Sequence, residues 1–117
     1  MKLYTFYTPS HETLATKYFL PSLSHNYDFD LVVKRFPQSC NNGEFMHDGW
    51  VNTMIQKVEY HIQSCIENYN SIFVYSDCDV QFLNNTDIKK ILLEELGDYD
   101  IACQNDVQPY YDRTTYC

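Results

Sequence analysis

Residues 72–83, IFVYSDCDVQFL, decide the fold, because an apolar run leads directly into two acidic residues. The run is rich in β-branched and aromatic residues and is bounded by polar residues, which is typical of a strand buried on both faces. Alternate residues of an extended chain point the same way, so we expect Asp77 and Asp79 to project together and Cys78 to face away.

Two carboxylates at the end of a buried strand repel each other and resist burial unless a cation joins them. Paired oxygen ligands suit Mg²⁺ or Mn²⁺, which keep further positions for water and for the phosphates of a substrate. A pair of acids in a solvated turn is the alternative, and it is the more common situation for an isolated D-x-D. The apolar segments on both sides favour a metal site at Asp77 and Asp79 here.

The length, the net charge and the hydropathy of the chain argue against several classes of partner. With 117 residues the chain is one domain at most, and 16 acidic against 8 basic residues give a net charge of -8, which argues against a nucleic acid or an anionic membrane as partner. No apolar run approaches the roughly 20 residues of a membrane span, and no signal peptide opens the chain, so we expect a cytoplasmic protein. The five widely spaced cysteines are expected to be reduced core thiols.

Strands and helices alternate along the chain. Strands are predicted at residues 3–8, 29–36, 72–83 and 100–104, and helices at 10–21, 49–69 and 86–96. Such an order predicts an α/β fold with a Rossmann-like, mostly parallel sheet and helices on both faces. Ligands bind such sheets outside the carboxyl ends of the strands, where residues 8–10, the loop after Phe36, the two acids and residues 104–106 are expected to gather.

The helix boundaries follow from local signals. Ser10 is expected to cap the first helix and Pro21 to end it, while Asp48 is expected to cap the longest helix and Gly97 to end the last one. The longest helix carries apolar side chains at i, i+3, i+4 spacing, which predicts the face that packs on the sheet. These are Met54, Ile55, Val58, Ile62, Cys65, Ile66 and Tyr69.

The geometry of the chain adds Lys57 to the candidate site. A crossover helix runs antiparallel to the strand that follows it, so from Lys57 the helix descends about 18 Å at about 1.5 Å per residue. The strand climbs back about 16 Å to Asp77 at roughly 3.3 Å per residue. Lys57 and the acid pair are therefore expected at a similar position along the strand direction. The Lys57 ammonium either contacts a phosphate there or lies in water with its stem along the core.

The segment SDCDVQF, preceded by a helix with Lys57 and followed by DIACQND at residues 100–106, resembles the nucleotide-diphospho-sugar transferases. These are glycosyltransferases of the GT-A fold, and the pattern is most similar to a branch with the motif SDxDIQFF. The resemblance covers most of the chain up to Asp106. It implies a donor-binding domain for a nucleoside-diphosphate sugar, with Mn²⁺ or Mg²⁺ as cofactor and an unknown acceptor.

Roles follow from the resemblance residue by residue. Asp77 and Asp79 match the metal-binding pair, and Lys57 matches the lysine near the diphosphate. Gln104 and Asp106 match catalytic or positioning residues that face the donor sugar or the acceptor. Three further residues lie where such folds hold the nucleotide: Thr8, Pro9 and His11.

The chain is shorter than the members of this family, whose domains need on the order of 200 residues. Residues 1–117 are therefore expected to form a single, partial GT-A domain, the donor half, with a missing C-terminal half and a tendency to self-associate. One rival is a haloacid-dehalogenase-type phosphatase with Asp77 as nucleophile and Asp79 as acid/base, since the segment DCDV fits its D-x-D-x-[TV] signature. The other is a non-catalytic nucleotide- and metal-binding fragment of a split transferase.

Overall fold

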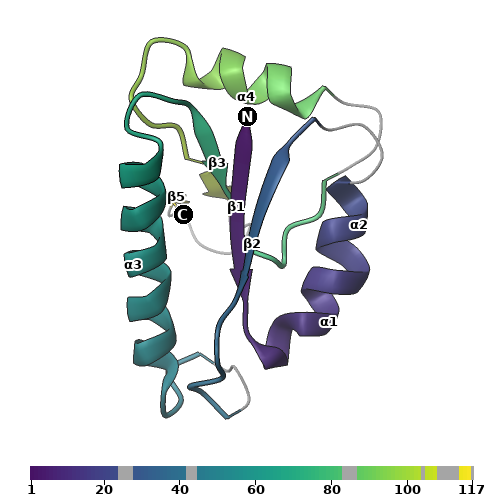
Figure 1. Cartoon of the computed structure of the whole chain (residues 1–117), viewed down its shortest axis with the longest axis vertical. Helices are drawn as coiled ribbons and strands as arrows, with labels where there is room; N and C mark the ends of the chain where they lie inside the picture. The colour runs from purple at the N-terminus through teal and green to yellow at the C-terminus, as the bar shows by residue number, and fades with distance from the viewer. Residues whose placement is uncertain (24–27, 42–44, 83–86, 104, 108–113, 117) are drawn as a thin grey trace. The chain divides into compact units, whose positions relative to one another are not determined.

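The computed structural model describes residues 1–23, 28–41, 45–82, 87–103, 105–107 and 114–116. The chain divides into two compact units, Met1–Thr86 and Asp87–Cys117, which are described separately. The first unit holds a parallel sheet in which β1 (Lys2–Tyr7) lies between β2 (Asp30–Arg35) and β3 (Phe73–Tyr75). Helices flank this sheet (Figure 1). The predicted α/β fold with a Rossmann-like parallel sheet is confirmed.

The central strand β1 is buried on both faces, so its alternate side chains enter two separate clusters. Leu3 packs with Phe19 and Leu23 on one face, under the helical segments that follow the strand. Those segments run without a break from the 3₁₀ turn η1 (Pro9–His11) through α1 (Glu12–Leu14) and the π-helix η2 (Ala15–Phe19) to α2 (Leu20–Leu23). Figure 1 shows them on the opposite side of the sheet from α3 (Trp50–Glu67).

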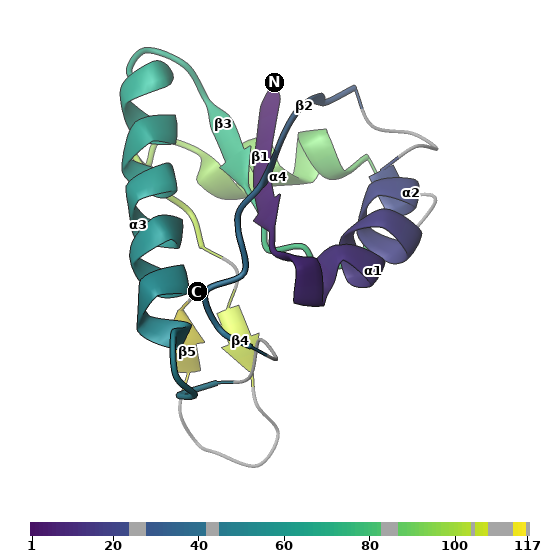
Figure 2. The ribbon, with the colours of Figure 1, turned by 60° about the horizontal axis from the view of Figure 1, so that its bottom comes forward.

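The second cluster lies under α3 and is largely aromatic. Tyr4 and Phe6 of β1 pack with Tyr60 of α3, and the Tyr4 and Tyr60 rings meet edge to face with centroids 6.0 Å apart. The hydroxyl of Tyr60 donates to the carbonyl of Val32, 3.2 Å away. The turned view of Figure 2 agrees with Figure 1 in placing α3 and the α1–α2 segment on opposite sides of β1. Helices therefore cover both faces of the sheet.

The strand order β2-β1-β3 contains a reversal of direction along the sheet. The chain steps from β1 to β2 on one side and then returns past β1 to add β3 on the other side. In open parallel sheets such a reversal opens a crevice outside the carboxyl ends of the two strands that diverge, and ligands bind there. The carboxyl ends of β1 and β3 are followed by Thr8 and by Asp77.

The helix after β1 differs from the prediction at both ends. Ser10 does not cap it, because the segment opens as a 3₁₀ turn behind Thr8, and neither Thr8 nor His11 makes a side-chain capping bond. Pro21 does not end it, since α2 continues to Leu23. The π-helix η2 precedes this proline, and its wider turn suits a residue that has no N–H and crowds the turn before it.

The start and the packed face of α3 also differ from the prediction. Gly49, with φ of 83°, occupies the N-cap position instead of Asp48, and no side chain caps the helix. Tyr60 and Ser64 are its buried residues, whereas Ile55, Val58 and most of the other predicted core residues are exposed. The face on the sheet is the polar one, because β1 and β3 offer tyrosine and phenylalanine rings that pack around Tyr60.

The acid pair does not lie on a strand. β3 ends at Tyr75 and is half-buried, and the chain after it is irregular, with a turn at Cys78–Asp79. The alternation expected for an extended chain therefore does not govern Asp77 and Asp79. Ser76 still donates its N–H to the carbonyl of Tyr4, so the loop leaves the sheet from a fixed point.

The second unit contains α4 (Ile88–Leu96) and a hairpin in which β4 (Asn105–Val107) pairs antiparallel with β5 (Thr114–Tyr116). Asp87 caps α4 by accepting from the N–H of Lys90 at 3.0 Å, and Gly97 ends it as predicted. Residues 100–103 form no strand, so the prediction of a strand there is wrong. Within the described ranges, no helix is both long and apolar enough to cross a membrane.

Candidate functional site

The site lies in the first unit, at the carboxyl ends of β1 and β3. A cavity of about 190 Å³ opens there. Its walls come from the end of β1 (Phe6, Tyr7, Thr8), the turn at Asp77–Asp79, the first half of α3 and the segment after β2. The cavity thus occupies the crevice that the reversal of strand order creates, where ligands of parallel sheets bind.

An ion pair between α3 and the loop after β3 forms one wall of the cavity. The Lys57 ammonium lies 2.7 Å from one carboxylate oxygen of Asp77 and 2.8 Å from the other. Both side chains are partly open to water, at 30% and 41% exposure, so the pair is screened and contributes little to stability. The height match expected from the helix and strand lengths is confirmed by this contact.

Asp79 and Cys78 line the same cavity from the turn. Cys78 is buried, and its burial together with the negative charges of Asp79 and Asp77 raises the pKa of the thiol to about 11. A thiol with that pKa stays protonated at neutral pH and is a poor nucleophile or metal ligand. The carboxylates of Asp77 and Asp79 are therefore the reactive groups of this turn.

His61, one turn after Lys57 on α3, stacks on Tyr75 at the end of β3, with ring centroids 3.8 Å apart. Burial lowers the pKa of His61, the positive charge of Lys57 lowers it further, and Asp77 opposes the shift. Burial and then the charge of Asp77 raise the pKa of Tyr75, whose hydroxyl is buried without a hydrogen-bond partner among the described residues. Both rings therefore remain neutral near pH 7, and neither supplies charge to the cavity.

Two of the three residues predicted to hold the nucleotide line the cavity. Thr8 is buried, and its hydroxyl lies 3.1 Å from that of Ser10, which in turn lies 2.9 Å from Nδ1 of His11. Pro9 is exposed and lies outside the lining residues. Thr8 and His11 therefore lie at the cavity and Pro9 does not, while their role in holding a nucleotide stays a prediction.

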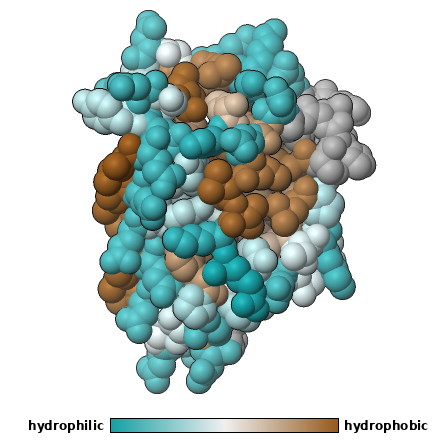
Figure 3. Space-filling view, viewed as in Figure 1, coloured by the Kyte–Doolittle hydropathy of each residue, from teal (hydrophilic) through white to brown (hydrophobic). Residues whose placement is uncertain are grey.

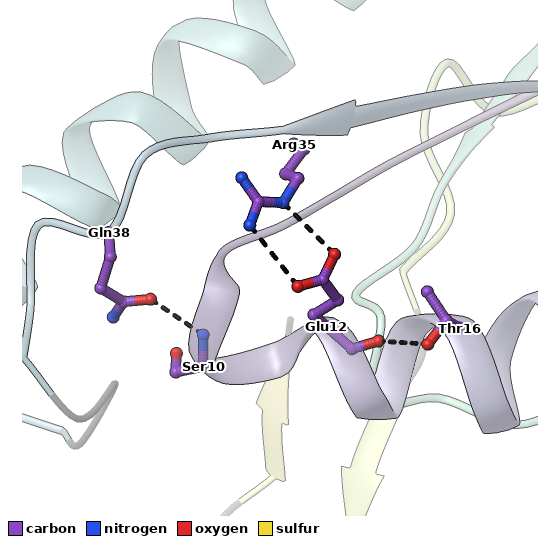
Figure 4. A network of polar contacts seen from close by, with 5 residues as sticks. All are labelled: Ser10, Glu12, Thr16, Arg35 and Gln38. Atoms are coloured by element: carbon purple, nitrogen blue, oxygen red, sulfur yellow. Dashed lines mark hydrogen bonds and ion pairs between the residues drawn. The ribbon is translucent and has the colours of Figure 1, made fainter.

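The segment after β2 is tied to the segment after β1 by polar contacts (Figure 4). Gln38 accepts from the backbone N–H of Ser10 at 2.9 Å, and Arg35 pairs with Glu12 at 3.4 Å. Gln38 also donates to the carbonyl of Cys40. These contacts hold two walls of the cavity together, which supports a pre-formed site.

Sequence reasoning missed six lining residues: Phe6, Tyr7, Gln38, Cys40, Thr53 and Met54. Trp50 also lines the cavity, and its ring meets that of Phe45 edge to face at 4.8 Å. Its position two turns before Lys57 on the same helical edge was the available signal. No pattern in the loop after β2 distinguished Gln38 from its polar neighbours.

Asp77 and Asp79 are the residues of the cavity wall that could hold a cation. No group of three or more metal-ligating side chains exists within the described parts of the chain. Mg²⁺ is commonly held by one or two carboxylates while water and substrate phosphates fill its other positions, and Asp77 and Asp79 supply two. Gln104 lies outside the described residues, and Asp106 belongs to β4 of the second unit, so their roles stay predictions.

Comparisons with known proteins leave the chemistry of the site as the only guide. No protein-family model, no curated protein and no solved structure matches this chain. Any assignment of function therefore has to rest on the cavity and on the groups that line it.

Proposed function

We propose that the first unit binds the diphosphate of a nucleoside-diphosphate sugar together with Mg²⁺ or Mn²⁺, as the donor domain of a glycosyltransferase. One observation carries the proposal: Lys57, Asp77 and Asp79 converge on a cavity at the point where strand order reverses. Parallel sheets bind nucleotides at this point. A lysine beside two carboxylates is a combination that suits a phosphate-bound cation.

The charges explain how an acidic protein accepts a diphosphate. Asp77 and Asp79 repel phosphate by themselves, and Lys57 neutralises only one of them. A bound divalent cation supplies a Lewis acid that stabilises the charge of the leaving diphosphate. Lys57 provides a second positive contact for the phosphates. The first turn of α3 adds to it, since Thr53 lines the cavity and helix N-termini attract anions.

The size of the cavity indicates which part of a donor it holds. Pockets that enclose a whole small ligand measure about 300–1,000 Å³, and this cavity measures about 190 Å³. A diphosphate and part of a ribose fill such a space. Trp50 and Tyr7 present aromatic surface in its wall, which suits the flat face of a ribose or a base.

The test is calorimetric titration with UDP and GDP, in Mn²⁺ and in EDTA. We expect binding only with the metal, and we expect Asp79→Asn to bind the nucleotides no better in Mn²⁺ than in EDTA. Lys57→Met is expected to weaken binding about tenfold, since it removes one charge-assisted contact. Two matched controls keep normal binding: Asp30→Asn and Lys17→Met remove the same charges at exposed positions of the first unit that do not line the cavity.

Three results would replace the proposal. Equal binding of both nucleotides in EDTA and in Mn²⁺ would show that binding does not depend on a metal at Asp77 and Asp79. Metal-dependent hydrolysis of a simple phosphomonoester that is lost in Asp77→Asn would instead identify the phosphatase chemistry that the segment DCDV also permits. Nucleotide binding without hydrolysis or transfer would leave a binding module, the third alternative.

A further inference from the structure

The face of α3 that points away from the sheet is apolar and exposed. Val51, Ile55, Val58 and Ile62 are between 51% and 60% exposed, and Ile66 is 71% exposed. In Figure 3 hydrophobic side chains lie along the left edge of the molecule, where α3 runs in Figure 1. A contiguous apolar face of this kind on a helix marks a contact surface for another chain.

The spacing along this face is that of a coiled-coil seam. Positions 51, 55, 58, 62 and 65 alternate steps of four and three residues, which places them at d, a, d, a and d of a heptad. Lys57, Tyr60 and Ser64 occupy the opposite side of the helix and face the sheet and the cavity. The seam is therefore independent of the packing that holds α3 in the first unit.

We propose that this seam joins two copies of the chain, with the two α3 helices antiparallel about a twofold axis. In a register that pairs four layers, the residue numbers of facing positions add to 120. Val58 then meets Ile62 of the second copy, and Ile55 meets Cys65 of the second copy. Each layer pairs a long side chain with a shorter one, so the layers have similar volume. Antiparallel helix dipoles also attract each other.

The area is close to the lower limit of a stable interface. Burying the five exposed apolar side chains and their neighbours on both copies removes roughly 1,000 Å² from water, which is near the minimum for a specific contact. The seam has only two and a half heptads, but α3 is already folded against the sheet and loses no backbone freedom on docking. We expect a reversible dimer with a Kd of about 10–100 μM.

Glu59 distinguishes an antiparallel from a parallel pair of α3 helices. It lies beside the seam at an e position, and in the antiparallel register it faces Glu59 of the second copy near the twofold axis. In a parallel pair it would face the apolar Met54 instead. Salt and Glu59→Gln should therefore both tighten an antiparallel dimer, since each weakens the repulsion of two like charges.

The first experiment measures the mass of the full chain by sedimentation from about 1 to about 500 μM. We expect the mass to double across this range and the Ile62→Asp variant to stay monomeric with an unchanged circular dichroism spectrum. Ile101→Asp is the matched control, because Ile101 is 75% exposed and lies outside the seam. A wild-type chain that stays monomeric at the highest concentration, for instance because another segment of its own covers the seam, would overturn the proposal.

The second experiment reads the orientation by disulfide trapping of Ile55→Cys, with Cys103 and Cys117 replaced by Ser. Antiparallel docking brings the new thiol to Cys65 of the second copy. Each bond then releases two protons and passes two electrons to an added copper(II) oxidant. The same two positions on one helix lie about 15 Å apart and cannot bond to each other. A covalent dimer that forms equally well with Cys65 alone would show a parallel pair and contradict the antiparallel seam.

Discussion

The face of the sheet under α2 and the face under α3 are held by different interactions. Leu3, Phe19 and Leu23 fill the α2 face by close packing, and two of them are fully buried. On the α3 face, aromatic rings pack edge to face, and the hydroxyl groups of Tyr4 and Tyr60 are hydrogen-bonded. Packing fixes volume, whereas hydrogen bonds also fix direction. The directional face is the one that carries Lys57 to the cavity.

The largest effect is expected on the α2 face. Phe19→Ala should lower the free energy of unfolding by about 3–5 kcal/mol, because it removes a fully buried ring and leaves a cavity. Chemical denaturation monitored by circular dichroism measures this. Tyr18→Ala is the matched control, with a change below about 1 kcal/mol, since Tyr18 is 53% exposed. Equal losses for both variants would contradict the packing described for this face.

A smaller loss is expected where α3 begins. Gly49 has φ of 83°, and a Cβ there would lie 1.8 Å from the carbonyl oxygen of Ser39. Gly49→Ala should cost about 2–4 kcal/mol, since it combines left-handed strain with a backbone overlap. Gly97→Ala is the comparison, because it shares the positive φ but has its nearest neighbour at 3.7 Å. Thermal unfolding should show a clearly larger fall of Tm for Gly49→Ala.

Removing one hydroxyl tests the directional face. Tyr4 accepts from Asn68 at 2.9 Å and donates to Glu67 at 3.0 Å, so Tyr4→Phe breaks two hydrogen bonds at the end of α3. We expect a loss of about 1–2 kcal/mol in the free energy of unfolding. Tyr60→Phe breaks one bond and should cost less. If neither variant changed the stability, the α3 face would be held by packing alone, like the α2 face.

The smallest effect is a pH dependence on the α3 face. Burial lowers the pKa of His61 below 6.5, so the folded chain binds fewer protons there than the unfolded chain. The contribution of His61 is fully present above pH 6.5 and is lost as the pH falls through the lowered pKa. Comparing denaturation at pH 7.5 and 5.5, we expect a smaller loss for His61→Gln than for the natural chain. Equal losses would show that His61 does not contribute.

The sequence predicted those features that depend on local patterns and chain geometry. The order of elements predicted the parallel sheet, and the lengths of helix and strand brought Lys57 to Asp77. It failed for the face of α3, because the heptad positions read as a core while the aromatic residues of β1 packed around Tyr60 instead. Tertiary contacts overrode periodicity there. Pro21 was misjudged because the π-helix before it has no sequence signal.

The position of β1 has a consequence for synthesis on the ribosome. Lys2 pairs with Asp30 and with Phe73, which follow it by 28 and 71 residues. At about 5–20 residues per second, the strand made first waits roughly 4–14 s before its second edge can be covered. Until Phe73 has been made, one edge of β1 has no partner strand within the sheet. The centre of this sheet is therefore completed last, although it is translated first.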